Sequence, residues 1–247
     1  MGSTASRYYR ICSEKNAKDM DDGQVSNRKA WLSVVAFTIV LALLLFVTAG
    51  TASYWEAWVL LAVIVVASIL ITRYLIRKDP ALLKRRLRGG PTAEKNLTQK
   101  IIMVFASIGF ISLIVVPALD HRFGLSHPPL YVVIAGDILV VIGFYSVFLV
   151  YRENTFASAT IEIAKDQRVI STGPYAIVRH PMYAGALLYL LGMPLALGSY
   201  WGLLALVATA PFLLWRIFDE ERFLSKNLPG YTEYLAKVRW RLIPGIF

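Results

Sequence analysis

The chain has 247 residues, of which 57% are hydrophobic, and a formal net charge of +10. This composition excludes an ordinary water-soluble domain, because so apolar a chain needs lipid as its main solvent. The cations are spread over short segments between apolar runs, which favours anionic lipid headgroups as their partners and argues against a nucleic-acid-binding face. Cys12 is the single cysteine, which excludes an intrachain disulfide and a cysteine-based metal cluster, and we expect no metal site.

The first part of the chain, residues 1–151, contains a polar tail and four apolar segments. Residues 1–29 lack the apolar core of a cleaved signal peptide, and their polar composition predicts a disordered tail. Each apolar segment is about as long as a membrane is thick, at roughly 1.5 Å per helical residue, and predicts a transmembrane helix. In chain order these segments are 30–54, 57–72, 101–119 and 129–151.

The distribution of lysine and arginine predicts the orientation of these segments. The tail and the loop at 73–100 are rich in both residues, and positively charged short loops stay on the cytoplasmic side of a membrane. The connections at 50–54, 120–128 and 198–200 contain one lysine or arginine, Arg122. We therefore expect both termini and the 73–100 loop in the cytoplasm.

The last part of the chain, residues 152–247, is built around an apolar hairpin. The run at 182–215 is too long for one ordinary crossing and contains a Leu-Gly-Ser-Tyr turn at 197–200. It predicts two antiparallel helices, so that the polar residues on either side of the hairpin meet at one membrane face. The expected fold is all-α and polytopic, with about six membrane segments and the functional site on the cytoplasmic face.

A shaped polar turn comes directly before this hairpin. Pro174 and Pro181 restrict the backbone at two points, which predicts a preorganised turn before a helix that begins near Met182. The positive end of that helix favours an anionic group, and Arg179 adds a full charge. Together with His180, these residues indicate a binding site.

A second polar element follows the hairpin. Arg216 and Glu220 are four residues apart on one helix face, where they can form an ion pair or divide between two groups of a ligand. A snorkelling arginine at the end of a membrane helix is the alternative interpretation. Tyr231 and Tyr234 lie in an aromatic and basic tail that we expect to cover the site and exclude water.

These two elements, in this order around an apolar hairpin, resemble the isoprenylcysteine carboxyl methyltransferase family. The resemblance rests on Gly-x-Tyr-x-x-x-Arg-His-Pro-x-Tyr-x-Gly at 173–185, on Arg-x-x-x-Glu-Glu at 216–221 and on a Tyr-x-x-Tyr tail. It covers about the last 95 residues. It implies an integral membrane enzyme that transfers a methyl group from S-adenosylmethionine and releases S-adenosylhomocysteine.

The resemblance also implies roles for particular residues. Arg216 and Glu220 are the expected catalytic residues, and acceptor binding is expected from Arg216, Tyr231 and Tyr234. The acceptor is a prenylcysteine-like carboxylate, a thiol or a lipid. The expected cofactor contacts are Gln167, Arg168, Val169, Ile170, Tyr175, Arg179, His180, Pro181, Met182, Tyr183 and Glu220.

Two other functions stay open at this stage. The membrane sterol and steroid reductases share an Arg-His-Pro-x-Tyr element and bind NADPH, although they usually carry asparagine where this chain has Met182. A transporter or lipid-binding membrane protein would use a buried polar group such as Asp137, which a packing role at a close helix contact explains equally well. Membrane lipid is the expected partner, and no obligate protein partner is evident.

Overall fold

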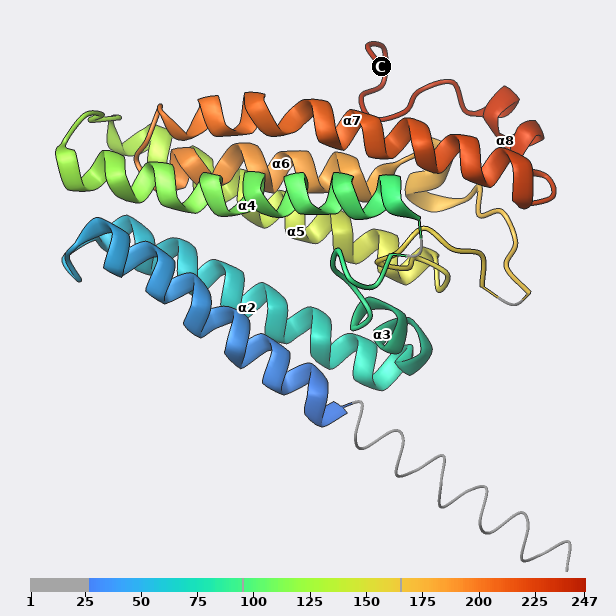
Figure 1. Cartoon of the computed structure of the whole chain (residues 1–247), viewed down its shortest axis with the longest axis horizontal. Coiled ribbons are helices and arrows are strands. Elements are labelled where there is room, and N and C mark those ends of the chain that lie inside the picture. Colours follow the sequence, from blue (N-terminus) through green and yellow to red (C-terminus); the bar gives the residue numbers. More distant parts are fainter. Residues whose placement is uncertain (1–26, 95, 165) are drawn as a thin grey trace, which may run out of the picture.

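The computed structural model describes residues 27–94, 96–164 and 166–247, and this part of the chain is helical without strands, as predicted (Figure 1). Disorder is predicted for the tail at 1–29. Residues 1–26 of this tail lie outside the described residues. In chain order the elements are Asn27–Ala49, α2 (Trp55–Lys78), α3 (Pro80–Arg86), α4 (Leu97–Phe123), α5 (Leu130–Glu153), η1 (Gly173–Ala176), α6 (Pro181–Ala196), α7 (Gly202–Asn227) and α8 (Tyr231–Lys237).

Five of these helices are long and apolar enough to cross a membrane, which gives the chain the architecture of a multi-pass membrane protein. They are the Asn27–Ala49 helix, α2, α4, α5 and α7. The first arm of the predicted hairpin, α6, has 16 residues and is shorter than an ordinary crossing. The hairpin turn lies where the sequence predicts it, with Leu197 ending α6 and Gly198 in the left-handed region at φ +67°.

The segment at 73–100 is more ordered than the loop predicted for it. It contains the end of α2, the whole of α3 and the start of α4. Asp79 explains the short helix, because its side chain accepts a hydrogen bond from the backbone of Leu82 while Pro80 occupies the first helical position. The chain therefore makes a tight corner here.

The two arms of the hairpin pack along earlier helices. α6 lies along α5, and glycines allow the two backbones to touch: a Cβ on Gly143 would lie 2.6 Å from the backbone nitrogen of Tyr189. α7 lies along α4, where a Cβ on Gly109 would lie 2.3 Å from the hydroxyl of Thr209. Small residues at such crossings let membrane helices approach closely.

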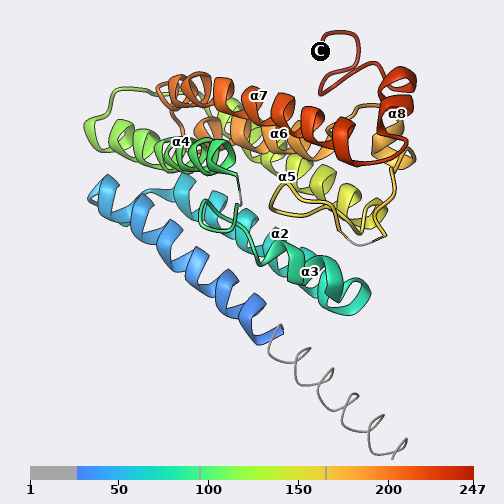
Figure 2. The same ribbon diagram turned by 45° about the vertical axis from the view of Figure 1, so that its right-hand side comes forward.

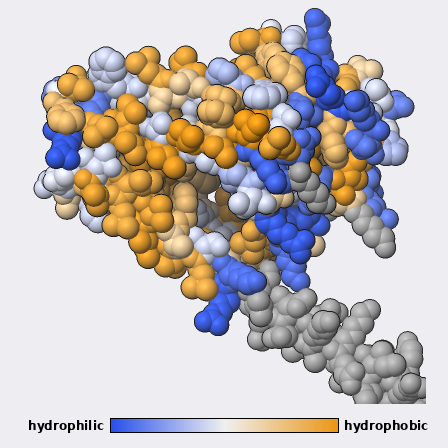
Figure 3. All heavy atoms as spheres, viewed as in Figure 1, coloured by the Kyte–Doolittle hydropathy of each residue, from blue (hydrophilic) through white to orange (hydrophobic). Residues whose placement is uncertain are grey.

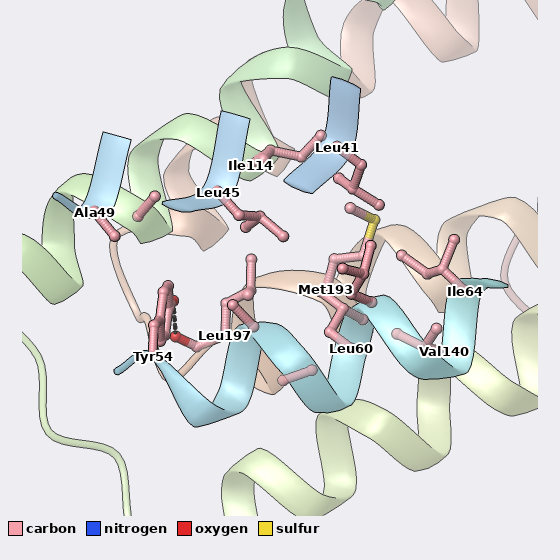
Figure 4. Packing of buried hydrophobic residues seen from close by; sticks show 14 residues of the cluster. Leu41, Leu45, Ala49, Tyr54, Leu60, Ile64, Ile114, Val140, Met193 and Leu197 are labelled. Atoms are coloured by element: carbon pink, nitrogen blue, oxygen red, sulfur yellow. Dashed lines mark hydrogen bonds between the residues drawn. The ribbon is translucent and has the colours of Figure 1, made fainter. Parts of the chain in front are cut away.

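The apolar core joins the first two helices to the hairpin (Figure 4). Leu45 and Leu60 pack with Met193 and Leu197, and all four side chains are buried. Tyr54 donates a hydrogen bond of 2.5 Å to the backbone oxygen of Leu197. This core closes the end of the bundle that contains the hairpin turn.

The opposite end of the bundle is more open. Figures 1 and 2 show the pair formed by the Asn27–Ala49 helix and α2 inclined to α4–α7 and separating from them toward α3. Polar residues gather at this end, while apolar residues cover most of the remaining visible surface (Figure 3). The polar segments before α6 and after α7 meet at the same end.

Candidate functional site

A polar cavity lies at this end, between the loop after α5, the turn before α6, the last turns of α7 and α8. Every site residue expected from the sequence lines it. These residues are Gln167, Arg168, Val169, Ile170, Tyr175, Arg179, His180, Pro181, Met182, Tyr183, Arg216, Glu220, Tyr231 and Tyr234. The structure therefore brings the two polar elements together, whereas their roles in binding and catalysis stay predictions.

The turn before α6 is held by hydrogen bonds at Tyr175. The Tyr175 hydroxyl accepts a hydrogen bond of 2.8 Å from the side-chain nitrogen of Asn154, and the Tyr175 backbone oxygen accepts one of 2.8 Å from the Tyr234 hydroxyl. Burial raises the pKa of Tyr175 and of Tyr234 above the ordinary value, so both phenols stay neutral. Tyr234 thus fastens α8 to this turn.

In the loop at 167–170, the side chains of Gln167 and Val169 make contacts within the protein. The side-chain oxygen of Gln167 accepts a hydrogen bond of 2.8 Å from the backbone of Ala164 in the same loop. Val169 packs into an apolar cluster with Tyr231 and Tyr234. These two side chains shape the loop and hold the base of α8.

Glu221 contacts Arg179 and His180, the two polar side chains directly before α6. One of its oxygens lies 3.2 Å from Arg179 Nη1 and 3.3 Å from His180 Nε2, and the other accepts from Arg241 Nε at 3.0 Å. The backbone nitrogens of Arg179 and His180 donate to the oxygens of Trp240 and Arg241. Glu221 therefore holds the C-terminal segment against the turn. The charge of Arg179 is paired with Glu221 inside the protein.

Tyr183 connects Arg216 with Glu220. The Tyr183 hydroxyl donates to Glu220 Oε2 at 2.6 Å and accepts from Arg216 Nε at 3.1 Å. The ion pair between Arg216 and Glu220 that their spacing allows is thus replaced by a bridge through a phenol. The bridge keeps the Glu220 carboxylate beside the cavity.

Glu94 and Gln99 contact Arg216 from behind the site, lining neither cavity, and the sequence interpretation missed both. Arg216 is 7% exposed, and its guanidinium donates to Glu94 at 2.9 Å, to Gln99 at 2.7 Å and to the backbone oxygen of Ala159 at 3.2 Å. Both residues lie in the first part of the chain, residues 1–151, for which the sequence predicts a tail, membrane helices and a basic loop. Two features of the sequence could have identified them: Glu94 is an acidic residue within a basic segment, and Gln99 is an amide in the first turn of an apolar helix.

A second, apolar cavity of about 690 Å³ lies among the Asn27–Ala49 helix, α2, α4, α6 and α7. Its volume is in the range of small-molecule sites, about 300 to 1,000 Å³. Four residues line both this cavity and the polar one and form the junction between the two: Ser158, Met182, Tyr183 and Arg216. Figure 3 shows a hollow in the middle of the face where the first two helices separate from α4.

Asp137, the other candidate from the sequence, lies on α5 and does not line the polar or the apolar cavity. Its Oδ1 is buried and has no hydrogen-bond partner among the residues that the structure describes. The neighbouring Gly136 touches the backbone of α6. Within 27–94, 96–164 and 166–247, no three His, Cys, Asp or Glu side chains form a group that could hold a metal ion.

Comparison with known families identifies a match that runs from α5 to just beyond α7. Residues 131–229 match a family model described as phospholipid methyltransferase. The cobalt-zinc-cadmium resistance protein CzcN of Cupriavidus metallidurans is 30% identical over 104 residues, which are 41% of this chain and 48% of the relative. The chain thus spans about half the length of this relative. The family match includes the Arg-His-Pro-x-Tyr element and Arg216 but begins after Glu94 and Gln99.

Proposed function

We propose that this protein transfers a methyl group from S-adenosylmethionine to a lipid-like acceptor, because residues 131–229 match a family model described as phospholipid methyltransferase. The observation that carries the proposal is the junction at Ser158, Met182, Tyr183 and Arg216, where a polar and an apolar cavity meet. Such an arrangement suits a reaction between a polar donor and an apolar acceptor. The polar cavity takes the donor, and the apolar cavity takes the chain of the acceptor.

The polar cavity offers groups that fit S-adenosylmethionine. Tyr175 and Tyr183 present aromatic faces, which attract a sulfonium cation, and Glu220 adds a carboxylate. Arg168 and the backbone at the start of α6 suit the carboxylate of the donor. When bound, the donor supplies an electrophilic methyl group, and its transfer is an in-line displacement that depends mainly on alignment and exclusion of water.

The C-terminal segment acts as the cover of this cavity. The volume of the polar cavity is about 120 Å³, which is less than the 300 Å³ or more of an ordinary ligand site. The segment that carries Tyr231 and Tyr234 therefore moves outward to admit the donor and closes again over it. Glu221, which holds Arg179 and Arg241, supplies the contacts that close it.

The apolar cavity determines how the acceptor arrives. It is lined by side chains of membrane-length helices, so an acceptor with a hydrocarbon chain enters it from the bilayer rather than from water. The junction residues then present the acceptor's reactive end to the donor. The basic segments lie at the same end of the bundle, so we place the site at the cytoplasmic face.

The test is a binding experiment followed by a labelling experiment. The full chain in phosphatidylcholine nanodiscs is expected to melt at a higher temperature with S-adenosylhomocysteine and at an unchanged temperature with NADPH. Stabilisation by NADPH alone would instead support the reductase function. Incubation with S-adenosylmethionine labelled in the methyl group then identifies the acceptor class, with label expected in the lipid-soluble fraction.

A further inference from the structure

Arg216 lies at the junction of the two cavities and forms an ion pair with Glu94 inside the protein. Glu94 contacts its Nη2 at 2.9 Å, and the two side chains are 2% and 9% exposed. The second oxygen of Glu94 accepts from the backbone nitrogen of Ile161 at 3.3 Å. Glu94 therefore ties α7 to the loop after α5 and neutralises Arg216 at the same time.

The other side chains that accept hydrogen bonds from Arg216 are neutral. Gln99 joins the guanidinium to the carboxylate of Asp219, and Tyr183 joins it to the carboxylate of Glu220. Arg216 thus has one directly paired carboxylate and two further carboxylates one hydrogen bond away. Arg86 is a second guanidinium near the junction, since it lines the apolar cavity and its Nη1 lies 3.7 Å from Met182 Sδ, but its bonds do not include Glu94. An anionic head group that approaches Arg216 has to compete with Glu94 for its guanidinium.

We infer that Glu94 is a specificity-determining residue that acts through Arg216 and disfavours acceptors with an anionic head group. This inference rests on the proposed function, because it assigns the apolar cavity to the hydrocarbon chain of the acceptor. It changes the role expected for Arg216 from the sequence. Arg216 stabilises the junction through its hydrogen bonds to Tyr183, Gln99 and Glu94. Glu94 determines which head-group charge the junction accepts.

The test uses three amphiphiles with one chain length and different permanent charges. Saturable binding of decanesulfonate, decyltrimethylammonium and decanol is measured on the full chain in phosphatidylcholine nanodiscs, with empty nanodiscs subtracted. Glu94→Gln keeps the shape and can still accept from Arg216, but it removes the charge. We expect it to bind decanesulfonate about tenfold more tightly, to bind decyltrimethylammonium more weakly and to leave decanol unchanged.

Two further variants separate charge from structure. Glu233→Gln removes the charge of an exposed carboxylate on α8 that lines neither cavity, and it should bind the three amphiphiles like the wild type. Glu94→Asp keeps the charge on a shorter side chain, so it should gain less for decanesulfonate than Glu94→Gln. It also serves as the test if Glu94→Gln does not fold.

The outcomes are distinct. Equal changes for all three amphiphiles, or no change for decanesulfonate in both Glu94 variants, overturn the inference. Binding of S-adenosylhomocysteine is measured on the same nanodiscs, and its absence contradicts the proposed function. The head-group preference is measured without donor or turnover, so its result tests the role of Glu94 separately. Opposite shifts for the anion and the cation support the role of Glu94.

Discussion

Arg216 Nε donates a hydrogen bond of 3.1 Å to the hydroxyl of Tyr183, and this contact stands in the wall between the polar and the apolar cavity. The same hydroxyl donates to Glu220, so a single phenol links the cation and the carboxylate of the second polar element. Tyr183 comes from α6 and Arg216 from α7. The contact therefore couples the two arms of the hairpin at the proposed site of methyl transfer.

The first prediction concerns this phenol. Tyr183→Phe removes the hydroxyl that orders Glu220 and Arg216, and we expect the affinity for S-adenosylhomocysteine to fall about tenfold, since a hydrogen bond to a charged group contributes about 1.5 to 3 kcal/mol. Calorimetric titration measures the change. Tyr189→Phe is the matched control, because Tyr189 lies on the same helix against Phe144. An equal loss in both variants would contradict the assigned role.

The second prediction concerns the cover of the polar cavity. Glu221→Gln removes the charge that pairs with Arg179 and Arg241, and we expect the docking of residues 231–247 to weaken by about 2 kcal/mol. Hydrogen exchange of backbone amides in this segment should accelerate, while exchange in α5 stays as in the wild type. Glu233→Gln, an exposed change on α8, is the control. Unchanged exchange in the segment would show that Glu221 does not hold it.

The third prediction concerns the contact between α5 and α6. Gly143→Ala places a Cβ 2.6 Å from the backbone nitrogen of Tyr189, which no side-chain movement relieves, so the helices must separate. We expect a loss of roughly 2 kcal/mol or more in stability and weaker S-adenosylhomocysteine binding, because α6 carries Met182 and Tyr183 into the site. Thermal melting in nanodiscs measures the loss. The neighbouring exposed change Ile142→Ala should melt within a few degrees of the wild type.

The fourth prediction separates an enzyme from a transporter. Asp137→Asn replaces the carboxyl group with an amide of the same shape, and since Asp137 lines neither the polar nor the apolar cavity, S-adenosylhomocysteine binding and methyl transfer should stay within about twofold of the wild type. A transporter that couples to this carboxylate would lose its activity. Loss of methyl transfer with intact binding would assign Asp137 a place in the reaction.

Most of the elements that form the site follow from local patterns. The lengths of the apolar runs predict the membrane helices, and the Gly-containing turn at 197–200 predicts where the hairpin reverses. The positions of Pro174 and Pro181 predict the turn and the start of α6. Such features depend on neighbours within a few residues, so the sequence carries them without knowledge of the tertiary packing.

The choice between Glu220 and Glu221 shows where local reasoning ends. Adjacent residues point about 100° apart around a helix, so one faces Tyr183 and the other faces Arg179 and the C-terminal segment. Which carboxylate faces which group depends on the rotation of α7, and that rotation is set by its packing on α4. The motif alone therefore leaves the two roles open.

Run length, charge distribution and proline positions act locally, so they are sufficient to predict a helical membrane protein whose two polar elements meet beside a hairpin. The positions of Glu94 and Gln99 against Arg216 become visible only in the folded chain. They lie 122 and 117 residues from Arg216, and contacts over such separations depend on how α4 and α7 cross. Local periodicity does not encode that crossing, since it arises from the close fit of Gly109 against Thr209 and from the corner that α3 makes before α4.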